Sequence, residues 1–155
     1  MENLSWAFGL ALIAVCIAVH AMGVVIMALT MVRVRNRLER QNSSLPDIVA
    51  CVIGVVGFVG LVLATLHMFE AAIWAAAYCW VDALGSYADA MLYSVDTMST
   101  RGASGLVLQE RWRMMGALEA SGGMLLFGIS TAYIFAVMQV YWPLLYPAVH
   151  SKPST

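Results

Sequence analysis

The sequence predicts an all-α membrane protein with three transmembrane helices and a re-entrant helix and loop between the second and third. Hydrophobic residues make up 62% of the 155 residues and charged residues 11%, with a mean hydropathy of +0.83. In soluble proteins, hydrophobic residues average about 45–50% and charged residues about 25%. Three apolar stretches are long enough to cross a hydrocarbon core of about 30 Å. The chain is long enough for one domain at most, and it has no basic patch that would indicate nucleic-acid binding.

The three cysteines indicate neither a disulfide framework nor a metal site. Cys16, Cys51 and Cys79 lie inside apolar stretches without Cys-x-x-Cys spacing, so we expect small buried hydrophobic side chains. The chain also lacks a nucleophile-and-base pattern, a metal triad and a cofactor motif. The sequence therefore predicts no enzyme activity, no resident metal and no cofactor.

The first predicted transmembrane helix covers Leu4 to Val32, interrupted by one basic or acidic residue, His20. The stretch is too long, and its basic flank is at the wrong end, for a cleaved signal peptide. A histidine at membrane depth acts as a pH sensor, a ligand or a hydrogen-bonded group inside the bundle. We expect the last of these, because the helix offers no second ligand at helical spacing.

The stretch from Arg33 to Gln41 is predicted to be a cytoplasmic loop. It contains four arginines and one acidic residue, Glu39. The positive-inside rule assigns such a loop to the cytoplasm. The N-terminus and the central loop are then outside, and the C-terminal tail with Lys152 is inside. Binding of lipid headgroups is the alternative use of these arginines.

A second helix is predicted to begin within Ser43 to Asp47, because Pro46 and Asp47 suit a first helical turn. Apolar residues continue from Ile48 past His67 and Glu70 to Trp80. A continuous helix of that length exceeds the hydrocarbon core, so its end must tilt, bend or protrude. The glycines at positions 54, 57 and 60 form a smooth stripe suited to close helix packing.

His67 and Glu70 are three residues apart and so share one face of this helix. We predict that they are polar anchors to a neighbouring element, with Arg111 and Arg113 as partners, because ionisable groups at this depth turn inward. A metal site is the alternative, although two ligands are a weak signal for one.

A short helix is predicted from Tyr87 to Met98. Ser86 is a suitable N-cap with Asp89 as the acid of a capping box, and Gly102 and Gly105 follow the helix. The helix is too short to span, and the segment from Tyr93 to Gly105 is polar between two apolar stretches. Irregular backbone at membrane depth must be buried in protein or line a water-filled cavity, so we predict a re-entrant helix and a pore or binding loop.

The third predicted span runs from Arg113 to Tyr141. It carries one acid, Glu119, and an adjacent glycine pair, Gly122 and Gly123. Pro143 is expected to end or kink it.

The segment Y-S-V-D-T-M-S-T-R-G-A-S-G, from Tyr93 to Gly105, resembles the pore helix and selectivity filter of the potassium-channel superfamily. Ser94 to Thr100 follow the family pattern, whereas Arg101 to Gly105 stand where the family has V-G-Y-G-D. The L-H-x-x-E-x-x-x-W pattern before it, and the W-R-M-M-G segment with the downstream Gly122–Gly123 pair, resemble the outer and inner helices of small bacterial two-transmembrane members. The resemblance covers roughly residues 66–138.

The resemblance implies a homotetramer with the pore on the fourfold axis, in the inner membrane of a bacterium, with lipid and monovalent ions as its other partners. Residues 42–142 would be the pore domain, 1–41 an additional helix with its basic loop, and 143–155 a cytoplasmic tail. Gly122 or Gly123 would be the gating hinge, with close helix packing as the alternative use. The filter-like loop would consist of Ser99, Thr100, Arg101, Gly102, Ala103, Ser104 and Gly105.

Potassium selectivity is not implied, because Ala103, Ser104 and Gly105 replace the aromatic residue, a glycine and the acid of the family filter. We expect Asp96 to lie behind the loop and to pair with Arg101. The pore is then lined by carbonyls and hydroxyls and passes monovalent cations with weak selectivity. If Arg101 faces the axis, the pore is anion-permeable or closed, and a non-conducting structural or regulatory subunit is the third hypothesis.

Overall fold

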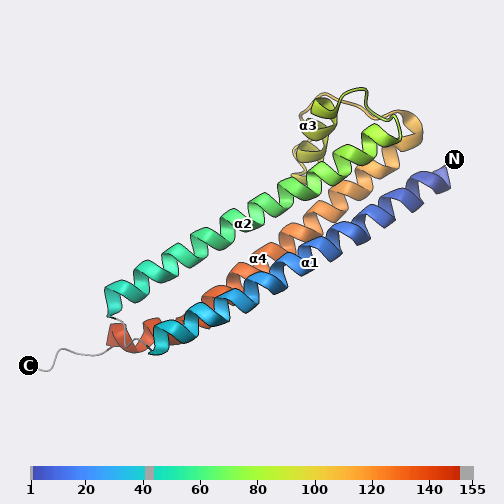
Figure 1. The fold of residues 1–155 in the computed structure, drawn as a ribbon. Helices are drawn as coiled ribbons and strands as arrows, with labels where there is room; N and C mark the ends of the chain where they lie inside the picture. The colour runs from blue at the N-terminus through green and yellow to red at the C-terminus, as the bar shows by residue number, and fades with distance from the viewer. Residues whose placement is uncertain (1, 41–43, 151–155) are drawn as a thin grey trace, which may run out of the picture.

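A computed structural model of the chain describes residues 2–40 and 44–150. Three long helices lie side by side, namely α1 (Glu2–Arg40), α2 (Leu45–Trp80) and α4 (Arg113–His150). The short helix α3 (Tyr87–Met98) and the 3-10 turn η1 (Glu110–Trp112) lie at the end that also holds the N-terminus (Figure 1). The described residues contain no strand. The predicted all-α fold is therefore confirmed.

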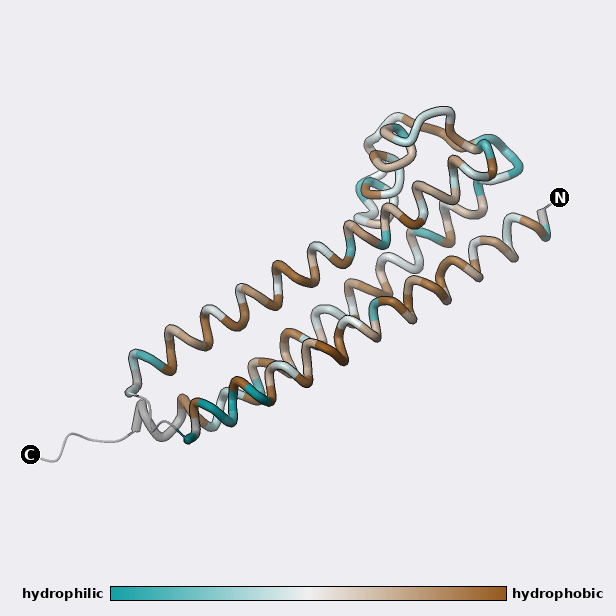
Figure 2. The backbone as a smooth tube through the Cα atoms, viewed as in Figure 1, coloured by the Kyte–Doolittle hydropathy of each residue, from teal (hydrophilic) through white to brown (hydrophobic). Residues whose placement is uncertain are grey.

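The three long helices are each long and apolar enough to cross a membrane. Hydrophobic residues cover their lengths, and hydrophilic residues gather toward the two ends (Figure 2). Large apolar side chains point outward along the helices, with exposed fractions of 68% for Ile53, 66% for Met124 and 64% for Phe135. A helix that is apolar all round is typical of a membrane span. The structure thus supports a multi-pass membrane protein.

Two apolar clusters hold the three long helices together. The first surrounds Trp74, Tyr78 and Met115 near the α3 end, and the second surrounds Val59 and Tyr141 toward the opposite end. Both clusters draw residues from α1, α2 and α4, and in each helix an intervening segment separates the two. The polar residues His20, His67, Glu70 and Ser130 occupy this intermediate level.

The predicted starts of α2 and α3 are confirmed. Ser44 is the N-cap of α2, with Pro46 in the first turn, and the Ser44 hydroxyl donates to Asp47 Oδ2 at 2.5 Å. Ser86 caps α3 by accepting a hydrogen bond from the backbone N–H of Asp89 at 3.4 Å. The Ser86 contact satisfies a backbone N–H of the first turn that has no intrahelical partner, whereas the Ser44 hydroxyl bonds a side chain and caps no backbone N–H.

Helix α3 ends in a Schellman motif. The N–H of Arg101 donates to the Asp96 carbonyl at 3.0 Å, and the N–H of Thr100 donates to the Thr97 carbonyl at 2.9 Å. Thr100 occupies the left-handed position of the motif, with φ of +56°, where glycine is usual. The chain therefore reverses direction immediately after Ser99.

Two predicted boundaries are wrong. Residues 33–40 are the last turns of α1 and not a loop, because arginine is a good helix former and cations are favourable at a helix C-terminus. Helix α4 does not end at Pro143 but continues to His150, as membrane helices tolerate proline; the alternative, a kink at Pro143, stays a prediction. Gln41 and Lys152 lie outside the described residues.

Glycines allow close approach at some helix contacts but not at the predicted stripe. An added Cβ at Gly23 would lie 2.9 Å from the Leu66 side chain, so α1 packs tightly on α2 there. At Gly54, Gly57 and Gly60 an added Cβ would meet nothing within 4 Å. Within the part of the chain that the structure describes, this stripe packs against no neighbouring helix.

Candidate functional site

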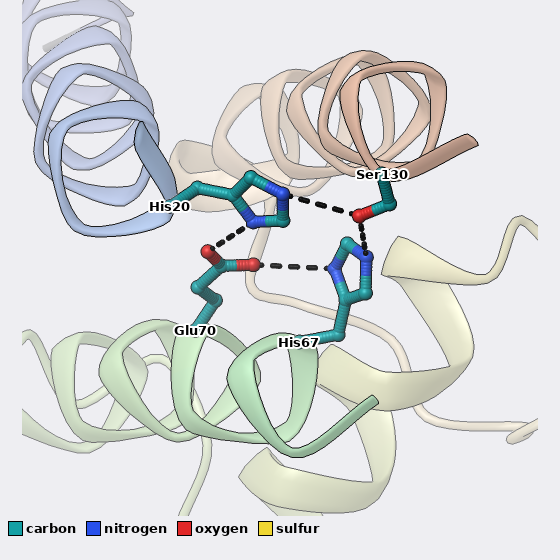
Figure 3. A network of polar contacts seen from close by, with 4 residues as sticks. All are labelled: His20, His67, Glu70 and Ser130. Atoms are coloured by element: carbon teal, nitrogen blue, oxygen red, sulfur yellow. Dashed lines mark hydrogen bonds and ion pairs between the residues drawn. The ribbon is translucent and has the colours of Figure 1, made fainter. Parts of the chain in front are cut away.

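Four polar side chains from three helices form a closed ring at the level between the two apolar clusters (Figure 3). Glu70 Oε1 accepts from His20 Nδ1 at 2.8 Å. The Ser130 hydroxyl lies 3.1 Å from His20 Nε2 and 3.0 Å from His67 Nε2. Glu70 Oε2 lies 3.2 Å from His67 Nδ1 and completes the ring. We call these four residues the polar ring.

The polar ring is almost completely buried. The exposed fraction is 0% for His20 and Glu70, 6% for Ser130 and 11% for the His67 side chain. Ionisable groups at membrane depth are costly unless they find partners. Their mutual contacts therefore join α1, α2 and α4 at one point.

Three of the four contacts in the polar ring are hydrogen bonds, and the fourth is not. His67 Nδ1 and Glu70 Oε2 are buried without a hydrogen-bond partner although they face one another. A carboxylate, two neutral imidazoles and one hydroxyl supply three protons, one for each hydrogen bond. His67 Nδ1 and Glu70 Oε2 then face each other as two acceptors. A cation at this position, either a proton or a metal ion, would satisfy both.

The polar ring confirms two sequence predictions and contradicts a third. His67 and Glu70 are indeed polar anchors to neighbouring elements, and His20 is hydrogen-bonded inside the bundle as predicted. The predicted partners Arg111 and Arg113 are wrong, because His20 and Ser130 are the partners of Glu70 and His67. Arg111 instead lies over the Trp112 ring, with its guanidinium carbon 5.6 Å from the ring centroid.

His20 was overlooked as the partner because it lies outside the segment that suggested the pairing. A signal was nevertheless present, since an isolated histidine in an otherwise apolar span must find a polar contact. In the three-helix arrangement, α1 packs on both α2 and α4. His20 therefore reaches Glu70 on one helix and Ser130 on the other.

A second buried network ties α3 to the long helices. Glu119 on α4 accepts from the Tyr78 hydroxyl at 2.7 Å and also contacts the Ser94 hydroxyl on α3. The Ser94 hydroxyl is also 2.9 Å from the Ala71 carbonyl of α2. Ser94 and Glu119 have exposed fractions of 0%. Glu119, predicted from the sequence as a polar anchor, thus lies at the junction of α2, α3 and α4.

The predicted glycine pair lies at tight contacts of α4. An added Cβ at Gly123 would lie 2.7 Å from the Met98 carbonyl oxygen, so the end of α3 rests directly on the α4 backbone. At Gly122 an added Cβ would lie 3.1 Å from the Ile13 side chain of α1. These contacts show close packing, while hinge bending stays a prediction.

Asp96 braces the loop that follows α3. Its Oδ1 accepts from Arg101 Nε at 2.5 Å, and its Oδ2 accepts from the Ser104 backbone N–H at 2.9 Å. The predicted pair of Asp96 and Arg101 is therefore present. The pKa of Asp96 is lowered to about 2, chiefly by the hydrogen bond from the Arg101 guanidinium. Burial raises this pKa, and the backbone N–H groups of the loop lower it further.

The remaining loop residues are largely open to the surroundings. Asp96 is 2% exposed and Arg101 is 61% exposed. Exposed or half-exposed along the same loop are Ser99, Thr100, Gly102, Ala103, Ser104 and Gly105. The loop thus has a buried acid on its inner side and an accessible outer side.

A small cavity of about 80 Å³ lies between the loop and the polar ring. Its lining includes His67 from α2, Ser99 after α3, and Phe127 from α4. The His67 ring stacks on Phe127 with centroids 4.3 Å apart. The cavity therefore links the beginning of the loop to the most exposed member of the polar ring.

Comparisons of the chain with protein-family models, curated proteins and solved structures find no match.

Proposed function

We propose that the protein is a homotetrameric ion channel of the potassium-channel fold, in which the loop from Ser99 to Gly105 lines a pore with weak selectivity among monovalent cations. What supports this function is the depth at which α3 ends. The Met98 backbone rests on Gly123, about 15 Å along α4 from Arg113 at about 1.5 Å per residue. Gly123 lies inside the apolar span of residues 110–145, so the loop after Met98 would start at membrane depth if the bilayer covers this part of α4.

Enclosure of the loop requires other subunits. Irregular backbone at membrane depth must be buried in protein or line a water-filled cavity. In the single chain, Thr100, Gly102 and Ala103 are exposed. Neighbouring copies around an axis would shield this backbone from lipid and leave its carbonyl groups facing water. The fourfold number follows the resemblance of the segment from Tyr93 to Gly105 to the potassium-channel superfamily.

Cation permeation is favoured by the contacts of Asp96. Because Asp96 binds the Arg101 guanidinium, the positive charge is compensated beside the loop. The C-terminal end of α3 carries the negative end of its helix dipole toward the same region. Carbonyl and hydroxyl groups attract cations, but the sequence from Arg101 to Gly105 lacks the repeated carbonyl cage that separates potassium from sodium.

Arg101 also supports a second candidate function. Its side chain is 61% exposed although it is paired, so part of the guanidinium stays on the accessible side of the loop. Four such groups near one axis would repel one another and exclude cations. The protein would then be an anion-permeable or non-conducting membrane subunit.

Reconstitution into liposomes separates these functions. We expect potassium and sodium flux of similar size and little chloride flux, with a reversal potential under a KCl gradient that shifts toward the potassium equilibrium potential. The Arg101→Gln variant should increase cation current, whereas Arg37→Gln, at an exposed position toward the opposite end of α1, should leave it unchanged. A shift toward the chloride equilibrium potential contradicts the cation channel. Absence of current from intact tetramers supports the non-conducting subunit.

A further inference from the structure

We propose that His20, His67 and Glu70 form a binding site for a divalent transition metal ion of the zinc class, buried where α1, α2 and α4 meet. Each residue offers a ligand atom, and the three atoms lie within 4.8 Å of one another. This site is independent of the proposed pore, because none of its ligands belongs to the loop from Ser99 to Gly105.

The donor set fits a borderline metal ion. Zinc binds imidazole nitrogen and carboxylate oxygen at about 2.0–2.2 Å, and sites with three protein ligands often use two histidines and one glutamate. Ligand atoms on a tetrahedral ion are about 3.4 Å apart at these bond lengths. The three side chains therefore need to close in from their present separations of up to 4.8 Å. A water molecule can occupy the fourth position, while Ser130 Oγ lies within 3.1 Å of the Nε2 atom of both imidazoles and would hold the two rings from the opposite side.

The unsatisfied atoms of the polar ring mark the place of the cation. Glu70 Oε2 and His67 Nδ1 are buried, face each other at 3.2 Å and form no hydrogen bond. With neutral imidazoles the ring carries one net negative charge in an apolar span, which is costly without a nearby positive charge. A metal ion held by both atoms would compensate the negative charge and would give both acceptor atoms a partner.

The loop side of the bundle is the side on which the ring is least covered. His67 is the most exposed member of the ring, at 11%. It borders the cavity of about 80 Å³ that also reaches Ser99 and lies next to Phe127. The other two ligands, His20 and Glu70, lie behind it with exposed fractions of 0%.

The chemistry of the ligands selects the class of ion. Imidazole nitrogen suits zinc, copper, iron and nickel, whereas calcium and magnesium require shells of six or more oxygen atoms. The described surroundings of the ring supply one carboxylate and one hydroxyl. We therefore expect zinc and cobalt to bind and calcium and magnesium not to bind.

The test is metal binding by the full chain, purified in detergent with a tag that contains no histidine and stripped with a chelator. Zinc titration by calorimetry and cobalt titration by visible absorption should each give about one ion per chain. The His20→Asn and His67→Asn variants should weaken zinc binding by more than the tenfold to hundredfold loss that is typical even for outer-shell partners. His150→Asn, which changes the third histidine of the chain, and replacement of all three cysteines by alanine should leave binding unchanged.

The wild-type titration decides the proposal even if a variant fails to fold. No zinc or cobalt binding by the monodisperse wild-type protein overturns it. Retention of zinc binding in the folded double variant His20→Asn/His67→Asn also overturns it. Because the titration needs no ion flux, a protein that binds zinc but does not conduct contradicts only the channel.

Discussion

Asp96 is the residue on which the loop after α3 most depends. It is almost fully buried and holds two separate parts of the loop, the Arg101 side chain and the Ser104 backbone. A carboxylate that accepts charge-assisted and backbone hydrogen bonds is stabilised in its charged form. Loss of that charge should therefore release both parts of the loop together.

We expect the loop to loosen in acid. Because its folded pKa is about 2, below the ordinary value of 3.8, Asp96 stabilises the folded loop above about pH 4, and this contribution is lost as the pH falls from 3.8 toward about 2. Hydrogen exchange of the Ser104 amide, corrected for its intrinsic pH dependence, should lose protection in this range. The Asp96→Asn variant should show weak protection at every pH. A wild-type amide that stays protected at pH 2 would contradict the prediction.

The two partners of the ion pair should not contribute equally. Asp96→Ala removes both loop contacts and leaves Arg101 unpaired, whereas Arg101→Ala leaves the Ser104 contact in place. We expect Asp96→Ala to destabilise the protein more than Arg101→Ala. The double variant should be more stable than the sum of the single changes indicates, because contacting residues are coupled. Thermal unfolding of the four proteins measures this coupling, and additive effects would show that the pair contributes nothing.

At the level of the helices, local sequence signals predicted some features and missed others. Cap and first-turn residues act over three or four positions, so Pro46 and Asp47 predicted the start of α2, and Ser86 that of α3, correctly. The end of α1 was predicted too early because the arginines of residues 33–40 indicate which side of the membrane they lie on, but they do not end a helix. The partner of Glu70 was missed because His20 is fifty positions away. Such a contact depends on the packing of α1, which no local pattern encodes.

The contact of α3 with α4 should be sensitive to a single methyl group. An added Cβ at Gly123 would lie 2.7 Å from the Met98 carbonyl oxygen and 2.9 Å from the Met98 Cα, and backbone atoms cannot move aside as a side chain can. Gly123→Ala should destabilise the protein by about 1–3 kcal/mol, the usual cost of overpacking, and should increase amide exchange in α3. At Gly128 an added Cβ meets nothing within 4 Å, so Gly128→Ala is the matched control. Equal thermal stability of both variants would contradict this contact.

For the whole molecule, the arrangement of the ends agrees with the predicted topology in one respect. The N-terminus, α3 and the loop after it lie at one end, and the arginines of residues 33–40 lie at the other (Figure 1). The two ends therefore face opposite sides if the helices cross a membrane. That the N-terminus is outside stays a prediction from the positive-inside rule.

We predict that four copies of the chain assemble around the loop after α3. If α4 spans the bilayer, the exposed backbone at Thr100, Gly102 and Ala103 would meet lipid in a single chain, and several kcal/mol per unsatisfied group oppose that state. Neighbouring copies remove the cost by enclosing the loop. Native mass measurement in mild detergent should therefore give four copies of the 16.8 kDa chain.

Cysteine labelling tests the same enclosure from the side of the loop. In a background without Cys16, Cys51 and Cys79, a Gly102→Cys variant should react with a small water-soluble thiol reagent but not with a lipid-confined one, because the assembled loop faces water. An Ile53→Cys variant, at an apolar position of α2 that is 68% exposed, should react in the opposite way. A population of monomers alone, or reaction of the Gly102→Cys thiol from the lipid phase, would refute the assembly. The loop would then protrude beyond the bilayer, and α4 would cross the membrane with a shorter part of its length than the channel requires.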